Sequence, residues 1–145
     1  MKGKNHLITG LIFIVLVFAV DLFLGLKIYS LLNNLDAIVV FSIFYLFFAG
    51  ILLPDADKFG SWIFKFFFPF AIISWTLGLL ISTTQGKKFK HRGFLHTPAG
   101  IIVTSLSSSI TLFLVLKIFM NIESIILLVF FLATTTGQII HLIFD

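Results

Sequence analysis

Histidine and aspartate, two residue types that bind metal ions, are concentrated in four short polar segments between long apolar stretches. Imidazole nitrogens and carboxylate oxygens are the ligands of zinc-like or manganese-like ions in proteins. The segments hold all four histidines of the chain, and they are residues 5–6, 53–57, 91–97 and 141–145. The sequence therefore predicts a metal site, provided that the fold brings these segments together.

The spacing inside two of these segments favours shared ligation. His141 and Asp145 are four residues apart, so they share one face of a helix, where two side chains can hold one ion. Asp55 and Asp57 come just after Pro54, which disfavours a helix before it and predicts that both carboxylates project from a loop. Each segment alone has a simpler interpretation, a polar helix end or a plain turn. Together they favour a metal site.

The third segment can contribute two ligands only if a helix begins after it. His91 and His96 are five residues apart and would point in different directions on one helix, whereas Gly93 between them permits a bend. Thr97 followed by Pro98 is typical of a helix N-cap and first turn, which predicts that start. By the same reasoning Asn5 is expected to cap the first helix.

Glycines accompany the histidines at helical spacing. Each lies four residues from a histidine, and they are Gly10 beside His6, Gly100 beside His96 and Gly137 beside His141. Small residues on such a face let membrane helices approach closely. A stripe of serine and threonine over residues 104–111 and 134–136 adds polar groups at similar depths. Hydrogen-bonded helix packing explains this stripe better than chemistry does.

The amino-acid composition indicates a membrane protein. The chain has 145 residues, of which 59% are hydrophobic and 11% charged, and its mean hydropathy is +1.17. These values lie far outside those of a soluble domain, and the length suits a single domain over 1–145. Cysteine is absent, so only nitrogen and oxygen can hold a metal. The net charge is +4, and the basic residues flank the apolar stretches. This position predicts contact with lipid headgroups and no nucleic-acid partner.

Five apolar stretches are long enough to approach the span of about 20 residues that a bilayer requires. They are residues 7–26, 35–53, 62–83, 98–116 and 124–144. The first contains no small-residue cleavage motif, so it is expected to be a retained span rather than a signal peptide. The third is interrupted by Lys65, Pro69 and Gly78, which suits either a segment that turns back or a proline-kinked span.

The distribution of basic residues distinguishes these alternatives. Five crossings divide the ten Lys and Arg residues evenly and separate the polar segments across the bilayer. If residues 62–83 form a re-entrant segment or two short helices, four crossings remain. Only Lys27 and Lys117 then face one side, and the other eight share the side of all four polar segments. The positive-inside rule favours this arrangement and makes the eight-charge side cytoplasmic. We therefore expect an all-α integral protein of the cell (inner) membrane, with a cytoplasmic N-terminus.

The polar segments, in this order, resemble the YdjM-like family of membrane-bound metal-dependent hydrolases. The resemblance rests on His6 with Gly10, Leu-Leu-Pro-Asp-x-Asp at 52–57, His-Arg-Gly-x-x-His at 91–96, and Gly-x-x-x-His-x-x-x-Asp at 137–145. Leu95 stands where relatives commonly have threonine, and Thr97 replaces their serine. Relatives also continue past the final aspartate, so the resemblance leads us to expect either a frayed ligand at Asp145 or a longer natural chain.

That family is similar in turn to zinc-dependent phospholipase C, which is helical and binds clustered zinc. The resemblance implies a phospholipase C-like metal site at one membrane face, with the ligands His6, Asp55, His91, His96, His141 and Asp145. Seven candidate ligands, counting Asp57, suit two divalent ions, zinc foremost and manganese or iron as alternatives. If Asp57 is not a ligand, it is the candidate general base, and Arg92 is the candidate clamp for an anionic oxygen.

These expectations converge on hydrolysis by metal-bound hydroxide at the cytoplasmic interface. The expected substrate is a phosphoester of a lipid or another membrane-associated molecule. Two alternatives stay open. A metal-ion or proton transporter would need polar groups at mid-membrane depth, and a non-catalytic scaffold stapled by metal would need no open coordination position. The sequence leaves the oligomeric state undetermined.

Overall fold

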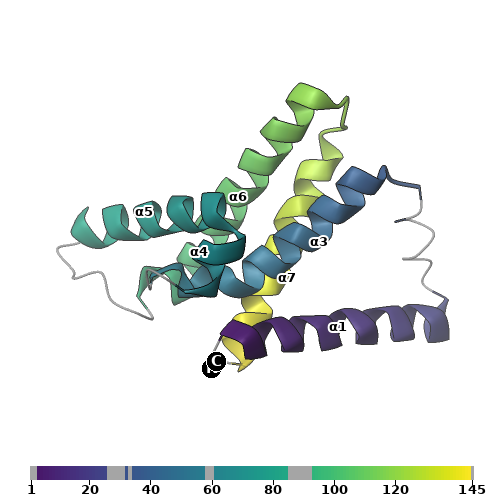
Figure 1. Ribbon diagram of the computed structural model, residues 1–145, viewed down its shortest axis with the longest axis horizontal. Helices are drawn as coiled ribbons and strands as arrows, with labels where there is room; N and C mark the ends of the chain where they lie inside the picture. The colour runs from purple at the N-terminus through teal and green to yellow at the C-terminus, as the bar shows by residue number, and fades with distance from the viewer. Residues whose placement is uncertain (1–2, 26–31, 33, 58–60, 85–92, 145) are drawn as a thin grey trace.

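Every element that the structure describes is a helix. The computed structural model describes residues 3–25, 32, 34–57, 61–84 and 93–144 (Figure 1). In chain order the elements are α1 (Gly3–Leu24), α3 (Ala37–Leu52), η1 (Leu53–Asp57), α4 (Trp62–Phe66), α5 (Phe68–Thr84), η2 (Phe94–His96), α6 (Pro98–Phe119) and α7 (Ile125–Phe144). This confirms the expected all-α class.

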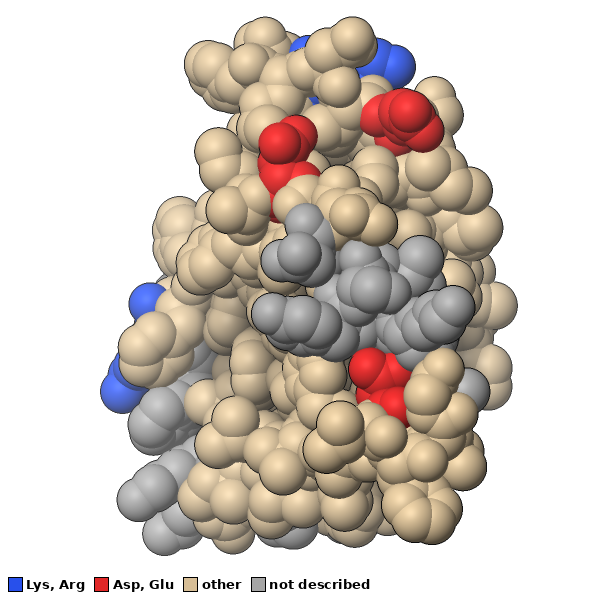
Figure 2. Space-filling model, turned by 90° about the vertical axis from the view of Figure 1, so that its right-hand side faces the viewer, with Lys and Arg blue, Asp and Glu red and all other residues tan. Residues whose placement is uncertain are grey.

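Four of these helices are long and apolar enough to cross a membrane. They comprise α1, α3 continued through η1, α6 and α7, with lengths of 20 to 22 residues. Their outer faces expose large apolar side chains; Leu22 and Phe23 on α1 are each 88% exposed. The face in Figure 2 accordingly carries few charged side chains among the residues described. Helix length and surface composition are those of an integral membrane protein.

The packed centre of the molecule is the α3–α7 pair, which glycine brings into close contact. A methyl group on Gly137 would overlap the carbonyl oxygen of Phe47, and one on Gly50 would overlap that of Thr134. A methyl group on Gly10 would meet only the end of the Ile51 side chain. The predicted role of the glycines beside His6 and His141 is thus confirmed, whereas Gly50 was not anticipated.

Helices α6 and α7 are joined by a buried polar seam. The Thr104 hydroxyl donates to the side-chain oxygen of Gln138 (3.1 Å), and the Gln138 amide donates to Ser105 Oγ (3.0 Å). The hydroxyls of Ser109 and Thr134 lie 3.4 Å apart. These bonds confirm the hydrogen-bonded packing expected of the stripe, although Gln138, at its centre, was not singled out.

The interrupted stretch forms a helix of five residues and a helix of 17 residues, and its turn back within the membrane stays a prediction. Helix α4 ends at Phe66, and Phe67 (φ −129°, ψ 38°) breaks the helix before α5. Pro69 lies in the first turn of α5, where its missing N–H costs nothing. The turn expected at Gly78 is wrong, because this glycine is buried inside α5. At 17 residues, α5 is shorter than the four candidate spans.

The two predicted helix caps have different outcomes. Thr97 caps α6 as expected, since its hydroxyl accepts the N–H of Gly100 at 3.1 Å, and η2 ends just before it. The cap expected at Asn5 is wrong, because α1 already begins at Gly3. The backbone carbonyl of Asn5 instead accepts the hydroxyl of Thr9 one turn later. His6 nevertheless lies in the opening turns of α1.

Candidate metal centre

Two histidines from opposite ends of the chain meet at one end of the helix assembly. His6 lies near the start of α1, and His141 lies in the last turn of α7 (Figure 1). Their rings stack with centroids 4.1 Å apart and planes at 26°. The side chains are 1% and 0% exposed. Glycine permits this approach, because Gly10 lies against α3 on the face of α1 that carries His6.

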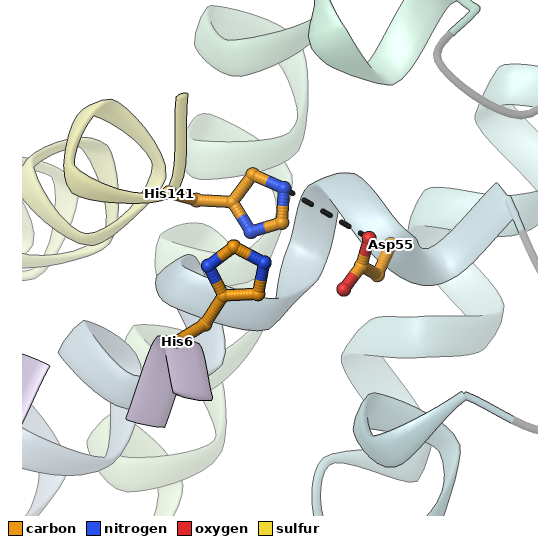
Figure 3. A group of neighbouring side chains, drawn as sticks. All are labelled: His6, Asp55 and His141. Atoms are coloured by element: carbon orange, nitrogen blue, oxygen red, sulfur yellow. Dashed lines mark ion pairs between the residues drawn. The ribbon is translucent and has the colours of Figure 1, made fainter. Parts of the chain in front are cut away.

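Asp55 completes the group from a third element. It lies in η1, directly after α3, and its Oδ1 is 3.8 Å from His141 Nε2 (Figure 3). The expectation of an irregular loop here is wrong, since residues 53–57 form a 3-10 helix. Pro54 cannot donate the α-helical hydrogen bond, and a tighter turn continues α3 instead. The Asp55 side chain is 18% exposed, so the group is more accessible here than at either histidine.

A backbone carbonyl orients the His141 ring. Its Nδ1 lies 2.7 Å from the carbonyl oxygen of Ile51. A carbonyl oxygen only accepts, so Nδ1 carries the proton of this hydrogen bond, and Nε2 lies on the Asp55 side of the ring. Metal-binding histidines are commonly held this way by a second contact. No motif in the sequence pointed to Ile51, because its contribution comes from the main chain.

The donor set fits a divalent ion. One ligand atom from each of His6, Asp55 and His141 lies within 4.8 Å of the others. Ligands of a tetrahedral zinc ion at about 2 Å lie roughly 3.3 Å from one another, so a modest contraction would bring all three into coordination. Among the described residues, two imidazoles and one carboxylate form the group, and three protein ligands are typical of catalytic zinc sites. Buried donors of this kind also need a cation or hydrogen bonds to offset their desolvation.

His96 borders this group. It ends η2, and its ring lies edge-on to that of His141 with centroids 5.4 Å apart. The structure therefore brings four of the predicted ligands to one place, three as a compact group and His96 beside it. The cap at Thr97 sets this position, since it ends η2 and starts α6.

The remaining predicted site residues cannot be located. His91, Arg92 and Asp145 lie outside the described residues. Asp57 ends η1, two residues after Asp55, and its side chain is likewise not described. A second ion, the general base and the anion clamp therefore stay predictions.

Comparisons of the chain with protein-family models, with curated proteins and with solved structures each find no match. The class of protein is therefore defined by its fold and by the group of His6, Asp55 and His141 alone. It is an all-helical protein with four candidate membrane spans and a His–Asp–His group, capable of holding a metal, where α1 begins and α3 and α7 end.

Proposed function

We propose that the protein is a membrane-embedded, metal-dependent hydrolase acting on a phosphoester of a lipid or another membrane-associated molecule. The observation that carries this proposal is the convergence of His6, Asp55 and His141 at the end of apolar helices. A divalent ion bound there would acidify a water molecule and polarise a phosphoryl oxygen. Zinc suits this donor set best.

Each residue of the group has a distinct task in this proposal. His6 and His141 hold the ion from two helices, and Asp55 holds it from η1. The Ile51 carbonyl fixes the orientation of His141. The buried histidines exclude water from behind the ion, and the partly exposed side at Asp55 admits the substrate. Electrostatic attraction is strengthened in such a dry site.

The resemblance to the YdjM-like family extends the proposal. In this extension His91, His96 and Asp145 contribute to a second ion, Asp57 accepts a proton from the attacking water, and Arg92 binds the phosphoryl oxygens. The metal site is proposed to face the cytoplasm, because eight of the ten basic residues lie on its side of the membrane in the four-crossing arrangement. The added residue roles and this orientation both rest on the sequence.

A transporter is the rival proposal, and the polar seam is the feature that favours it. Thr104, Ser105 and Gln138 lie on the two helices that border the His–Asp–His group. Their hydrogen bonds, however, satisfy one another across the helix interface, as expected of packing. The ligand group itself lies at helix ends rather than midway along the spans, which favours hydrolysis at the interface.

Metal analysis and a hydrolysis screen test the proposal together. Wild-type protein purified without chelator should contain zinc or a related ion, whereas His6→Ala and His141→Ala should lose it. His96→Ala tests the neighbouring histidine, and Leu22→Ala, on the exposed far end of α1, is the matched control. The wild type should cleave a lipid phosphoester, and the histidine variants should not. Wild type without metal would refute the proposal, and metal-dependent ion uptake by liposomes without hydrolysis would favour the transporter.

A further inference from the structure

An apolar groove shares helix α1 with the candidate metal centre. It has a volume of about 640 Å³ and lies between α1 and the α4–α5 bend, with α3 as its floor. Its lining is apolar and aromatic, and includes Leu7 and Leu11 on α1, Tyr45 and Phe48 on α3, and Phe66 and Phe67 at the bend. The Tyr45 hydroxyl donates to the Phe66 carbonyl at 3.4 Å, which ties the floor to one wall.

Helix α1 connects the groove with the metal centre. Leu7 directly follows His6, and successive residues on a helix are rotated by about 100°. His6 and Gly10 therefore face the α3–α7 pair, while Leu7 and Leu11 face the groove. One helix thus supplies a ligand on one face and a groove wall on the next.

The direction of the groove follows from its floor. Residues 41, 44, 45 and 48 of α3 line it, and Asp55 comes after the C-terminal end of that helix. The groove consequently extends along α3 for roughly 10 Å, the length of seven helical residues, and leads away from Asp55, which lies seven residues beyond its near end at Phe48. In a membrane-spanning arrangement this is the direction from the interface into the hydrocarbon layer.

The chemistry of the lining selects one occupant. A peptide segment would bring backbone N–H and C=O groups that these side chains leave unpaired in a lipid environment. A helix from a second copy of the chain would need small residues for close packing, whereas phenylalanine and leucine line this groove. A flexible hydrocarbon chain needs no hydrogen bonds and can follow the irregular aromatic surface.

We propose that this groove binds one acyl chain of a lipid substrate and presents the phosphoester of that lipid to His6, Asp55 and His141. The inference rests on the proposed hydrolase function and narrows its substrate to a lipid that enters sideways from the bilayer. Lipid tails are as apolar as the groove, so transfer into it gains little hydrophobic energy. Its contribution is to hold the ester linkage in position beside the reacting groups.

Photocrosslinking tests the inference. Purified wild type is incubated in mixed micelles with a phosphatidylglycerol that carries a diazirine within one acyl chain, and labelled residues are mapped by mass spectrometry. Labelling should concentrate on peptides that contain Leu11 and Phe48, above the level on the exposed face of α6 at Ile118 and Phe119. Equal labelling of groove and outer face would overturn the inference.

Two variants that fill the groove make the test specific. Leu11→Trp and Ile8→Trp place an indole at lining positions that are 57% and 48% exposed, so both are expected to fold. Each should reduce groove labelling to the level of the outer face. Leu22→Trp, on the same helix but outside the groove, should leave labelling unchanged. Groove labelling that persists in both filled variants would contradict the proposed location.

Metal content measured on the same samples separates this inference from the proposed function. The filled variants should retain the metal of the wild type, because none of them alters a ligand. Groove labelling without metal in the wild type would refute the hydrolase and leave the lipid site. Metal without preferential groove labelling would refute the acyl-chain site and leave the hydrolase.

Discussion

The imidazole rings of His6 and His141 stack with their centroids 4.1 Å apart, and so join the first described helix of the chain to the last. Helix α1 otherwise packs sparsely, since His6, Gly10 and Asp21 are the only buried residues in its candidate span, residues 5–24. Figure 1 shows that α1 runs obliquely away from α3 beyond this contact. The candidate metal centre therefore helps to hold α1, together with the packing of Gly10 and Phe13 against α3.

This arrangement predicts that the metal stabilises the fold. An ion that binds only the folded protein adds about 2.7 kcal/mol at a free concentration of roughly 100 times its Kd. Removal of the ion with a chelator should lower the Tm of the wild type, and zinc should restore it. His6→Ala should abolish the response to both treatments, whereas Leu22→Ala should respond like the wild type. A His6→Ala variant that still gains stability from zinc would contradict the assigned ligand.

Alanine at the α3–α7 contact should be destabilising. In Gly137→Ala and Gly50→Ala the added methyl group meets backbone carbonyl oxygens that cannot move without separating the helices. We expect a loss of about 1–3 kcal/mol in the free energy of unfolding. Gly10→Ala is the matched comparison and should cost less, because it meets only the flexible end of Ile51. Reversible SDS unfolding of the purified protein would rank the three variants, and equal losses would argue against this packing.

Gln138 should stabilise the α6–α7 interface without serving the metal centre. Gln138→Leu removes hydrogen bonds to Thr104 and Ser105 and should cost roughly 1 kcal/mol, as such bonds do in membrane proteins. Ser107→Ala removes only a bond to the carbonyl of Thr104 within α6 and should cost less. Metal content should be unchanged in both variants. Loss of metal, or of ion transport, in Gln138→Leu would instead connect the seam to function.

The Thr97 cap should matter through its hydroxyl oxygen. Thr97→Ala leaves the N–H of Gly100 without its acceptor and should cost about 1 kcal/mol. Thr97→Ser keeps the oxygen and should retain most of the stability. Thermal unfolding monitored by circular dichroism can measure both. Equal destabilisation of the two variants would assign the effect to the lost methyl group rather than to the cap.

The four-crossing arrangement can be tested with single cysteines, because the natural sequence contains none. Lys2→Cys and Lys88→Cys should react with a membrane-impermeant maleimide from the same side of the membrane. Asn121→Cys, in the connection between α6 and α7, should react from the opposite side. Labelling of right-side-out and inverted vesicles distinguishes these cases. Reaction of Lys88→Cys from the side opposite to Lys2→Cys would exclude the arrangement.

The sequence alone determined the features that depend on local physics. Long apolar runs predicted the four candidate spans, since a bilayer requires about 20 apolar residues for each. Thr97 and Pro98 predicted the start of α6, because both act on the first helical turn. The four polar segments identified the residue types able to bind a metal. None of these inferences requires knowledge of how one helix is rotated against another.

Only the tertiary structure decided which side chains meet. Helices that are apolar on every side do not reveal in their sequence which face packs inward, because lipid and a neighbouring helix are equally apolar. Rotation and register therefore come from long-range contacts, such as Gly137 against the Phe47 carbonyl. Those contacts bring His6, Asp55 and His141 together. They also place the Ile51 carbonyl where it orients the His141 ring, and they form an apolar groove whose lining includes Leu7.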